Sequence, residues 1–200
     1  PPAEAVVLGG GVAGRNAARA LLGCGARVTL LDVDYDLLRE LHWHFEGQVT
    51  TYITSPYTLA KVLCFADVVV GAVRIREGRA PVVVDSGQVE NLREGSVVID
   101  LSIDQGGCFE SSRPTRLSDP TYIRHGITHF CVPNVPSLVA RTATHALSIA
   151  VLPYVSRIAE EGLETAVDSD SALRRGTGII AGRPADPYLA GDGAQSGGSA

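Results

Sequence analysis

Short runs of apolar residues alternate along most of the chain with segments in which apolar residues recur every three or four positions. The short runs are rich in Val, Ile and Thr, as expected for strands that are buried on both faces. The longer segments have the spacing of amphipathic helices. We predict strands at residues 5–8, 27–31, 48–53, 67–73, 96–101 and 127–132. We predict helices at residues 12–22, 36–45, 57–65, 86–92 and 136–159, the last with a kink at Pro153.

This alternation predicts an α/β fold with a doubly wound parallel sheet, the Rossmann type. Parallel strands need crossover connections, which are usually helical and right-handed, so helices cover both faces of the sheet. Ligands bind such sheets outside the carboxyl ends of the strands. The pattern weakens after residue 168, where we expect little order, and the Gly- and Ser-rich residues 191–200 predict a flexible tail.

The first predicted strand runs into a glycine-rich loop, Gly9-Gly10-Gly11-Val12-Ala13-Gly14, which fits G-x-G-x-x-G. The pattern alone is common, but here it follows a strand, opens a helix and precedes a second strand that ends in an acid. Gly9 permits the tight turn, Gly11 lets the backbone approach a pyrophosphate, and Gly14 lets the helix pack closely on the strand. Val12 and Ala13 begin the helix, whose unpaired N–H groups favour an anion. The loop therefore predicts dinucleotide binding.

Asp32 ends the second predicted strand, where the acidic residue of a dinucleotide site belongs. Its carboxylate can accept both hydroxyls of the adenosine ribose and would repel a 2′-phosphate. Asp34 competes for this role, and either Asp34 or Asp36 is placed to cap the following helix. No Lys or Arg stands at residues 33–38 to bind a 2′-phosphate. The residues therefore predict NAD(H) as the cofactor rather than NADP(H).

Two further polar loops follow predicted strands at the same edge of the sheet. Residues 103–110 contain Asp104 and follow the fifth strand, and residues 132–136 contain Asn134 and follow the sixth. In a sheet that binds a dinucleotide, loops at these strand ends fall where the nicotinamide reaches. An ordinary turn is the alternative interpretation of each loop alone, since Gly, Pro, Asn and Asp are common turn residues.

Together these segments resemble one family, the alanine dehydrogenases and the related NAD(P) transhydrogenase α subunits. The resemblance extends from Val6 to Pro153. The motif Asp104-Gln105-Gly106-Gly107-Cys108 resembles that of the alanine dehydrogenases. The segments that carry it are residues 9–14, 31–32, 55–56, 67–72, 103–110, 112–115, 118–121, 131–136, 141–142 and 152–154.

The resemblance implies an NAD-dependent oxidoreductase that interconverts L-alanine with pyruvate and ammonia. By similarity, Asp32 binds the adenosine ribose, and Ser55 and Val73 line the adenine side. Asp104 is implied as the catalytic residue, beside substrate and nicotinamide, where it can orient ammonia or water or assist proton transfer. Hydride transfer itself belongs to the cofactor. The residues implied to hold the nicotinamide end are Ile103, Asp104, Val132 and Asn134.

Members of this family are roughly twice as long as this chain, with a substrate domain that precedes the Rossmann unit and supplies a catalytic Lys and His and an Arg. The sequence begins at the first Rossmann strand, so the resemblance implies that the substrate domain is missing and that the chain alone is inactive. We assign residues 1–160, including the long helix, to the NAD-binding domain. Residues 161–200 are assigned to a return segment and the flexible tail, the return segment resembling the family's at residues 176–187.

The family also implies a homo-oligomer, or a partner chain that supplies the missing half, with alanine or pyruvate as the small-molecule substrate. The alternative is a stand-alone NAD(H)-binding module that regulates another protein, or docks onto it, without catalysis of its own. An intact cofactor loop without the catalytic half motivates that alternative.

Charge and hydropathy argue against some other classes of partner. Seventeen Lys and Arg against 22 Asp and Glu give a net charge of −5, which argues against nucleic acid and anionic membranes. No uninterrupted apolar run reaches the roughly 18 residues that a membrane span needs, and the N-terminus lacks the pattern of a signal peptide. The chain starts at Pro1-Pro2 and has no Met, which fits a processed chain, an excised domain or a piece of a longer protein.

The four cysteines are widely spaced and form no C-x-x-C pair, which argues against a zinc site or a thioredoxin-like motif. They predict reduced thiols in a cytoplasmic protein. His42 and His44 point apart on a helix, and His125 and His129 lie outside one, so we predict no metal site.

Overall fold

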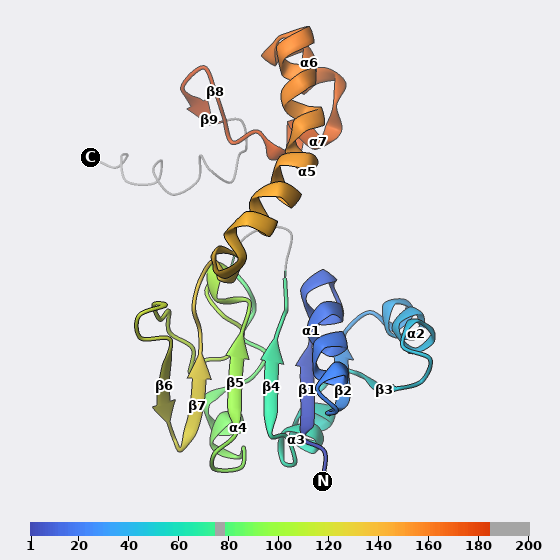
Figure 1. The fold of residues 1–200 in the computed structure, drawn as a ribbon, viewed down its shortest axis with the longest axis vertical. Helices are drawn as coiled ribbons and strands as arrows, with labels where there is room; N and C mark the ends of the chain where they lie inside the picture. Colours follow the sequence, from blue (N-terminus) through green and yellow to red (C-terminus); the bar gives the residue numbers. More distant parts are fainter. Residues whose placement is uncertain (75–78, 185–200) are drawn as a thin grey trace, which may run out of the picture. The chain divides into compact units, whose positions relative to one another are not determined.

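The computed structural model describes residues 1–74 and 79–184. The chain forms two compact units, Pro1–Val135 and Pro136–Ala200. The first unit is a twisted sheet with helices on both faces, and Figure 1 shows its strands side by side with their arrowheads nearly all in one direction.

The sheet has the strand order β3-β2-β1-β4-β5-β7-β6, so the order reverses between β1 and β4. Every neighbouring pair is parallel except β6 with β7, which is antiparallel. The doubly wound Rossmann-type sheet is thus confirmed, with one edge strand added. The strands are β1 (Glu4–Leu8), β2 (Arg27–Asp32), β3 (Val49–Ile53), β4 (Val68–Gly71), β5 (Val97–Asp100), β6 (Thr121–Arg124) and β7 (Ile127–Phe130).

Sequence analysis missed β6 because this strand has no buried side chain and so no apolar alternation. The predicted strands 67–73 and 127–132 were also too long at their carboxyl ends. The last residues of each prediction leave the ladder and form the loops that border the site.

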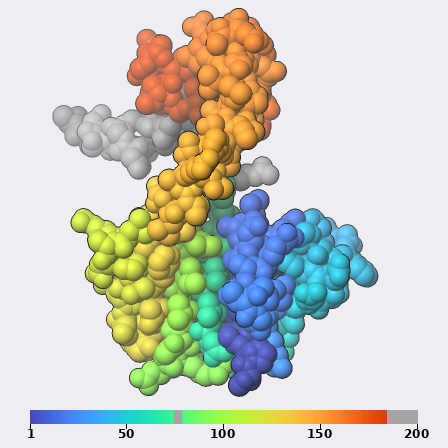
Figure 2. All heavy atoms as spheres, in the orientation of Figure 1, coloured from blue at the N-terminus to red at the C-terminus, as the bar shows by residue number. Residues whose placement is uncertain are grey.

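Alternating side chains of the strands feed two separate apolar clusters, one on each face. Val6 and Leu8 of β1 point to the cluster under α3 (Pro56–Leu63) and α4 (Ser86–Glu90). Ala5 and Val7 point to the cluster under the other two helices, α1 (Val12–Gly23) and α2 (Tyr35–His44). Each fully buried Val or Leu contributes about 1.5–3 kcal/mol relative to an exposed one. Figure 2 shows α1, in blue, lying on its face of the sheet.

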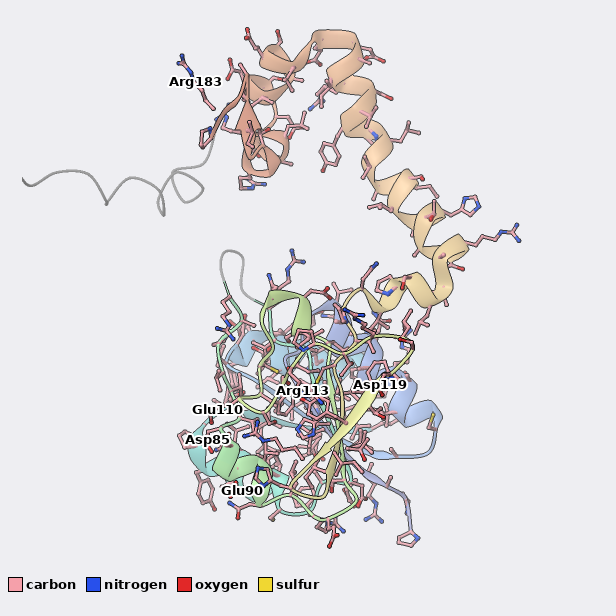
Figure 3. The ribbon with its side chains drawn as sticks, turned by 90° about the vertical axis from the view of Figure 1, so that its left-hand side faces the viewer. Asp85, Glu90, Glu110, Arg113, Asp119 and Arg183 are labelled. Carbon is pink, nitrogen blue, oxygen red and sulfur yellow. The ribbon has the colours of Figure 1, made fainter. Side chains whose placement is uncertain are left out.

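Local side-chain caps fix where α2 and α4 begin. The Asp34 carboxylate accepts a hydrogen bond from the Leu37 backbone N–H, so Asp34 is the N-cap of α2, one of the two residues predicted for it. At the start of α4, Asp85 caps the Gln88 N–H, and Glu110 accepts the Ser86 N–H at 2.7 Å. Asp85 and Glu110 lie close together there (Figure 3), and the Ser86 N–H lowers the pKa of the Glu110 carboxyl.

The second unit holds helices and a short hairpin: α5 (Ala140–Glu161), α6 (Leu163–Ser169), α7 (Ser171–Gly176), β8 (Ile179–Ile180) and β9 (Arg183–Pro184). Arg157 on α5 pairs with Glu161 and with Asp170, whose side chain also caps α7. The expectation of little order beyond residue 168 was therefore wrong for residues 169–184. The predicted flexible tail at residues 191–200 lies outside the described residues.

The compact units divide between Val135 and Pro136, whereas the sequence analysis placed a boundary at residue 160. No side chain of α5 is buried among the described residues. Helix α5 continues past Pro153.

Together with the preceding turn, α5 forms a helical stretch, Val135–Glu161, that is long and apolar enough to cross a membrane by length and composition alone. The search for an uninterrupted apolar run did not find it because Arg141 and His145 break the run. A helix that packs against other protein meets the same criterion. The large apolar side chains that it exposes are Leu147, Ile149, Val151, Leu152, Tyr154 and Val155.

Candidate functional site

Two glycines of the loop after β1 are required by the fold itself. Gly9 has φ +96°, a conformation that L side chains rarely adopt, and a Cβ there would lie 2.6 Å from the Ala72 carbonyl oxygen. A Cβ on Gly14 would lie 1.8 Å from the Gly9 carbonyl oxygen. Both positions therefore hold β1, β4 and α1 in close contact, as the sequence analysis predicted for Gly9 and Gly14.

Gly11 is different, because a Cβ added there meets no described atom within 4 Å. It is the N-cap of α1, and no side chain caps this helix. The exposed residues Val12 and Ala13 follow it. The start of α1 thus has no side-chain cap and leaves space beside Gly11, and a helix N-terminus of this kind suits an anion.

A cavity of about 410 Å³ opens beside this loop, at the carboxyl ends of β1, β2 and β4. This position is the point at which the strand order reverses, where doubly wound sheets bind their ligands. We call it the Asp32 cavity. It is lined by Leu8, Gly9, Gly11, Leu31, Asp32, Val33, Asp34, Leu37, Thr54, Ala72, Val73, Arg74, Pro81 and Val83.

The Asp32 carboxylate is fixed by two backbone donors. The Gly10 N–H donates to Oδ2 at 2.6 Å, and the Asp34 N–H donates to Oδ1 at 3.0 Å. Each carboxylate oxygen has a further lone pair, so Asp32 can still accept two hydroxyls. Asp34 lines the same cavity, and its Oδ1 accepts the Leu37 N–H at the start of α2. Both carboxylates border the cavity, and Asp32 is the one that the Gly10 N–H holds against the glycine loop.

A second cavity, of about 290 Å³, lies at the carboxyl ends of β4 and β5. We call it the Asp104 cavity. Asp104 stands on a short 3₁₀ helix, Ile103–Gln105, that follows β5. The Asn134 backbone N–H donates to both Asp104 oxygens, at 3.1 and 3.3 Å. The cavity is lined by Ala13, Ala72, Val73, Arg74, Leu101, Ser102, Asp104 and Gln105.

Arg74, which the sequence analysis overlooked, lines both cavities. It is the only cation among the described residues around either one. Its position directly after a strand, at the ligand-binding edge of the sheet, was a signal that could have found it.

A polar cluster of Ser111, Arg113, Tyr122 and His129 joins the end of the loop after β5 to β6 and β7. The Arg113 guanidinium lies 4.2 Å from the centre of the Tyr122 ring, which stacks on the ring of His129. His129 is fully buried, with Nδ1 at 3.0 Å from the Ile127 carbonyl oxygen and Nε2 at 2.8 Å from the Ser111 hydroxyl. Burial lowers the pKa of His129 and raises the pKa of Tyr122.

The sequence and fold were compared with known proteins. The family described as "Alanine dehydrogenase/PNT, C-terminal domain" matches residues 1–186. The alanine dehydrogenase of Mycolicibacterium smegmatis is 43% identical over 175 residues, which are 88% of this chain and 47% of that protein. That of Methanococcus maripaludis is 42% identical over 183 residues, 91% of this chain and 49% of that protein.

The chain belongs to the alanine dehydrogenase/PNT C-terminal domain family. A solved L-alanine dehydrogenase agrees, with a TM-score of 0.86 and 39% identity over 94% of this chain and 52% of the other. A transhydrogenase from Sinorhizobium meliloti, at 24% identity and a TM-score of 0.63, shares the fold. The resemblance stated from the motifs is confirmed. The chain spans about half the length of the curated relatives that it matches.

Three of the residues that the family implies, Ser55, Ile103 and Val132, do not line either described cavity. The Ser55 hydroxyl accepts the Thr58 N–H and caps α3, and Ser55 does not line the described Asp32 cavity, whereas its neighbour Thr54 does. The side chains of Ile103 and Val132 are buried and pack inward, so only their backbone groups can face a ligand. The residues that line a cavity as expected are Gly9, Gly11, Ala13, Asp32, Val73 and Asp104.

Proposed function

We propose that this chain is the NAD(H)-binding half of an oxidoreductase of the alanine dehydrogenase type, which interconverts L-alanine, NAD and water with pyruvate, ammonia and NADH. One observation carries the proposal. The uncapped N-terminus of α1 lies between two cavities, one bordered by the preorganised Asp32 carboxylate and the other by Asp104. A dinucleotide needs this succession of a ribose acceptor, an anion site and a polar group near the reacting ring.

The cofactor would be held by groups that are already in place. The pyrophosphate would face the first N–H groups of α1, and Asp32 would accept the hydroxyls of the adenosine ribose. A 2′-phosphate would meet the charges of Asp32 and Asp34, so NAD(H) is preferred over NADP(H). Arg74, between the cavities, supplies the positive charge that a pyrophosphate would need.

Asp104 would act on the substrate side of the nicotinamide. The bound cofactor supplies the hydride chemistry. The Asp104 carboxylate is exposed in its cavity and fixed by the Asn134 N–H. From there it can orient ammonia or water and accept or return a proton as the carbinolamine of the substrate forms and collapses.

The rest of the active site would come from a substrate domain outside this chain. The curated relatives are about twice as long as the segment matched here, and they are named for the complete activity. The exposed apolar side chains of α5 support a further protein surface against this helix, in a homo-oligomer or with a partner chain. We propose a cytoplasmic location, in line with the reduced thiols that the sequence predicts.

A chimera tests the proposal. The matching half of the Mycolicibacterium smegmatis alanine dehydrogenase is replaced with this chain, and NADH oxidation is followed with pyruvate and ammonia. The intact relative is the positive control, and the relative's other half alone is the blank. We expect turnover that needs both halves. A folded chimera that binds NADH but shows no turnover would instead favour the stand-alone binding module, which the comparisons do not favour.

A further inference from the structure

Asp100, the last residue of β5, is a carboxylate that is almost completely buried, with 1% of its surface exposed. Four donors surround it. The Ser102 N–H donates to Oδ1 at 2.9 Å, the Cys108 N–H donates to Oδ2 at 3.0 Å, and the Ser112 hydroxyl donates to Oδ2 at 2.6 Å. The Cys108 thiol is a weaker donor to Oδ1, at 3.7 Å. The carboxylate therefore binds the beginning, the middle and the end of the loop that carries Asp104.

Burying a carboxylate is costly unless hydrogen bonds or a cation compensate it. Among the described residues, no cation lies within ion-pair distance of Asp100, so these hydrogen bonds provide the compensation. The loop also wraps tightly around the carboxylate. A Cβ on Gly107 would lie 2.8 Å from Asp100 Oδ2. The position of the carboxylate and the path of the loop are thus mutually determined.

Further hydrogen bonds join this loop to the loops that follow β4 and β7. The Ser102 hydroxyl donates to the Val73 carbonyl at the end of β4, 2.8 Å away. The Cys131 thiol, just after β7, donates to the Ser112 hydroxyl at 3.6 Å. Asp104 then accepts the Asn134 N–H. The loops after β4, β5 and β7 are in this way tied to one another around Asp100.

We infer that Asp100 is a positioning residue, which acts through the loop of residues 102–112 to hold Asp104 against Asn134 and so to shape the nicotinamide end of the site. The geometric part of this inference stands on the hydrogen bonds alone. Its consequence for ligand binding rests on the proposed function. No contact between Asp100 and the ligand is required.

The variant Asp100→Asn tests the inference, because its amide group turns one acceptor into a donor facing the Cys108 N–H or the Ser112 hydroxyl. Asp67→Asn is the control. Asp67 accepts the Glu4 N–H at 2.8 Å and pairs with Arg93 at the opposite ends of the strands, so its substitution perturbs a carboxylate far from Asp104. The first readout is the Asn134 amide resonance in a ¹⁵N–¹H spectrum. We expect an upfield shift in Asp100→Asn, as its bond to Asp104 loosens, and no shift in the control.

The second readout is calorimetric affinity for NADH and for ADP-ribose, which lacks the nicotinamide. We expect Asp100→Asn to weaken NADH about tenfold, the effect of one lost hydrogen bond, and to leave ADP-ribose within about twofold of the unchanged chain. An unmoved Asn134 amide, or an equal loss of affinity for both ligands, overturns the inference.

Two other outcomes also decide the inference. Should Asp100→Asn fail to fold, Ser112→Ala removes one donor and keeps the carboxylate, and it must shift the Asn134 amide in the same direction. Should the unchanged chain bind neither ligand, the proposed function fails, while the Asn134 amide still decides whether Asp100 positions Asp104.

Discussion

The backbone N–H of Asn134 donates to both oxygens of the Asp104 carboxylate, although 30 residues separate them. Because β5 and β7 are neighbours in the sheet, the loops at their carboxyl ends meet. Asn134 has φ +54°, a conformation that Asn tolerates better than most residues. Two residues that the sequence suggested separately thus form one hydrogen-bonded unit beside a cavity.

Asp104→Asn keeps this bond to Asn134 but removes the ability to take up a proton. We expect kcat in the chimera to fall by about 100-fold or more, the usual contribution of a general acid–base group. The affinity for NADH should change little. Steady-state kinetics and calorimetry measure the two effects. Asp119→Asn, an exposed aspartate on a turn away from both cavities, is the control. Equal activity of the two variants would remove Asp104 from the mechanism.

Gly11→Ala and Gly14→Ala should separate binding from folding. The methyl group on residue 11 meets no protein atom, so the melting temperature should not change, but it would stand where the pyrophosphate approaches. We expect NADH affinity to fall about tenfold or more, as for the loss of one charge-assisted hydrogen bond.

The methyl group on residue 14 would press against the Gly9 carbonyl. We expect a loss of about 3 kcal/mol or more in the free energy of unfolding, at the upper end for an over-packed site. Thermal melts and NADH titrations of both variants provide the measurements. If Gly11→Ala instead lowered stability as much as Gly14→Ala and left NADH binding intact, the loop would have a structural role alone.

The four cysteines differ in their exposure to solvent. Cys24 and Cys64 are exposed, whereas Cys108 and Cys131 are buried, and burial raises the pKa of both buried thiols. Since the thiolate is the reactive form, only the exposed pair should react with iodoacetamide in the native protein near neutral pH. Mass spectrometry after a short exposure should find labels on Cys24 and Cys64, and on all four cysteines in denaturant. Rapid native labelling of Cys108 would contradict the buried loop around Asp100.

His129 should make stability depend on pH. Burial lowers its pKa in the folded protein, so the unfolded chain binds a proton more readily. The stability that the neutral ring contributes is present above the ordinary histidine pKa of about 6.5 and is lost as the pH falls through the folded value. His129→Gln should therefore flatten the fall in melting temperature below pH 6.5. His42→Gln, at an exposed histidine on α2, is the control and should keep the full slope.

Much of the fold could be predicted from local pattern. The six parallel strands, their crossovers and the ligand-binding edge follow from apolar runs and turn residues, because these signals are local. β6 could not be predicted, since an exposed edge strand such as Thr121–Arg124 has no buried side chain to mark it. The hairpin after α7 was missed for a similar reason, because its strands have only two residues each.

The sequence suggests candidate site residues where a residue's type and its place at a strand end coincide, as for Asp32 and Asp104, and both line a cavity. For Ser55, the sequence cannot tell a cavity-lining serine from a helix cap, and the structure shows its hydroxyl accepting the capping bond from the Thr58 N–H. Asp100 was passed over since its role depends on donors brought together by long-range packing, such as Ser112. Local sequence patterns cannot predict such long-range contacts.

The central claim is that this chain binds NAD(H) through Asp32 and the glycine loop. Isothermal titration of the chain with NADH and with NADPH, repeated with Asp32→Asn, tests it most directly. We predict that NADH binds, that NADPH binds at least about tenfold more weakly because its 2′-phosphate meets two carboxylates, and that Asp32→Asn narrows this difference. Equal affinity for the two cofactors, or no heat of binding with NADH at millimolar concentration, would contradict the account.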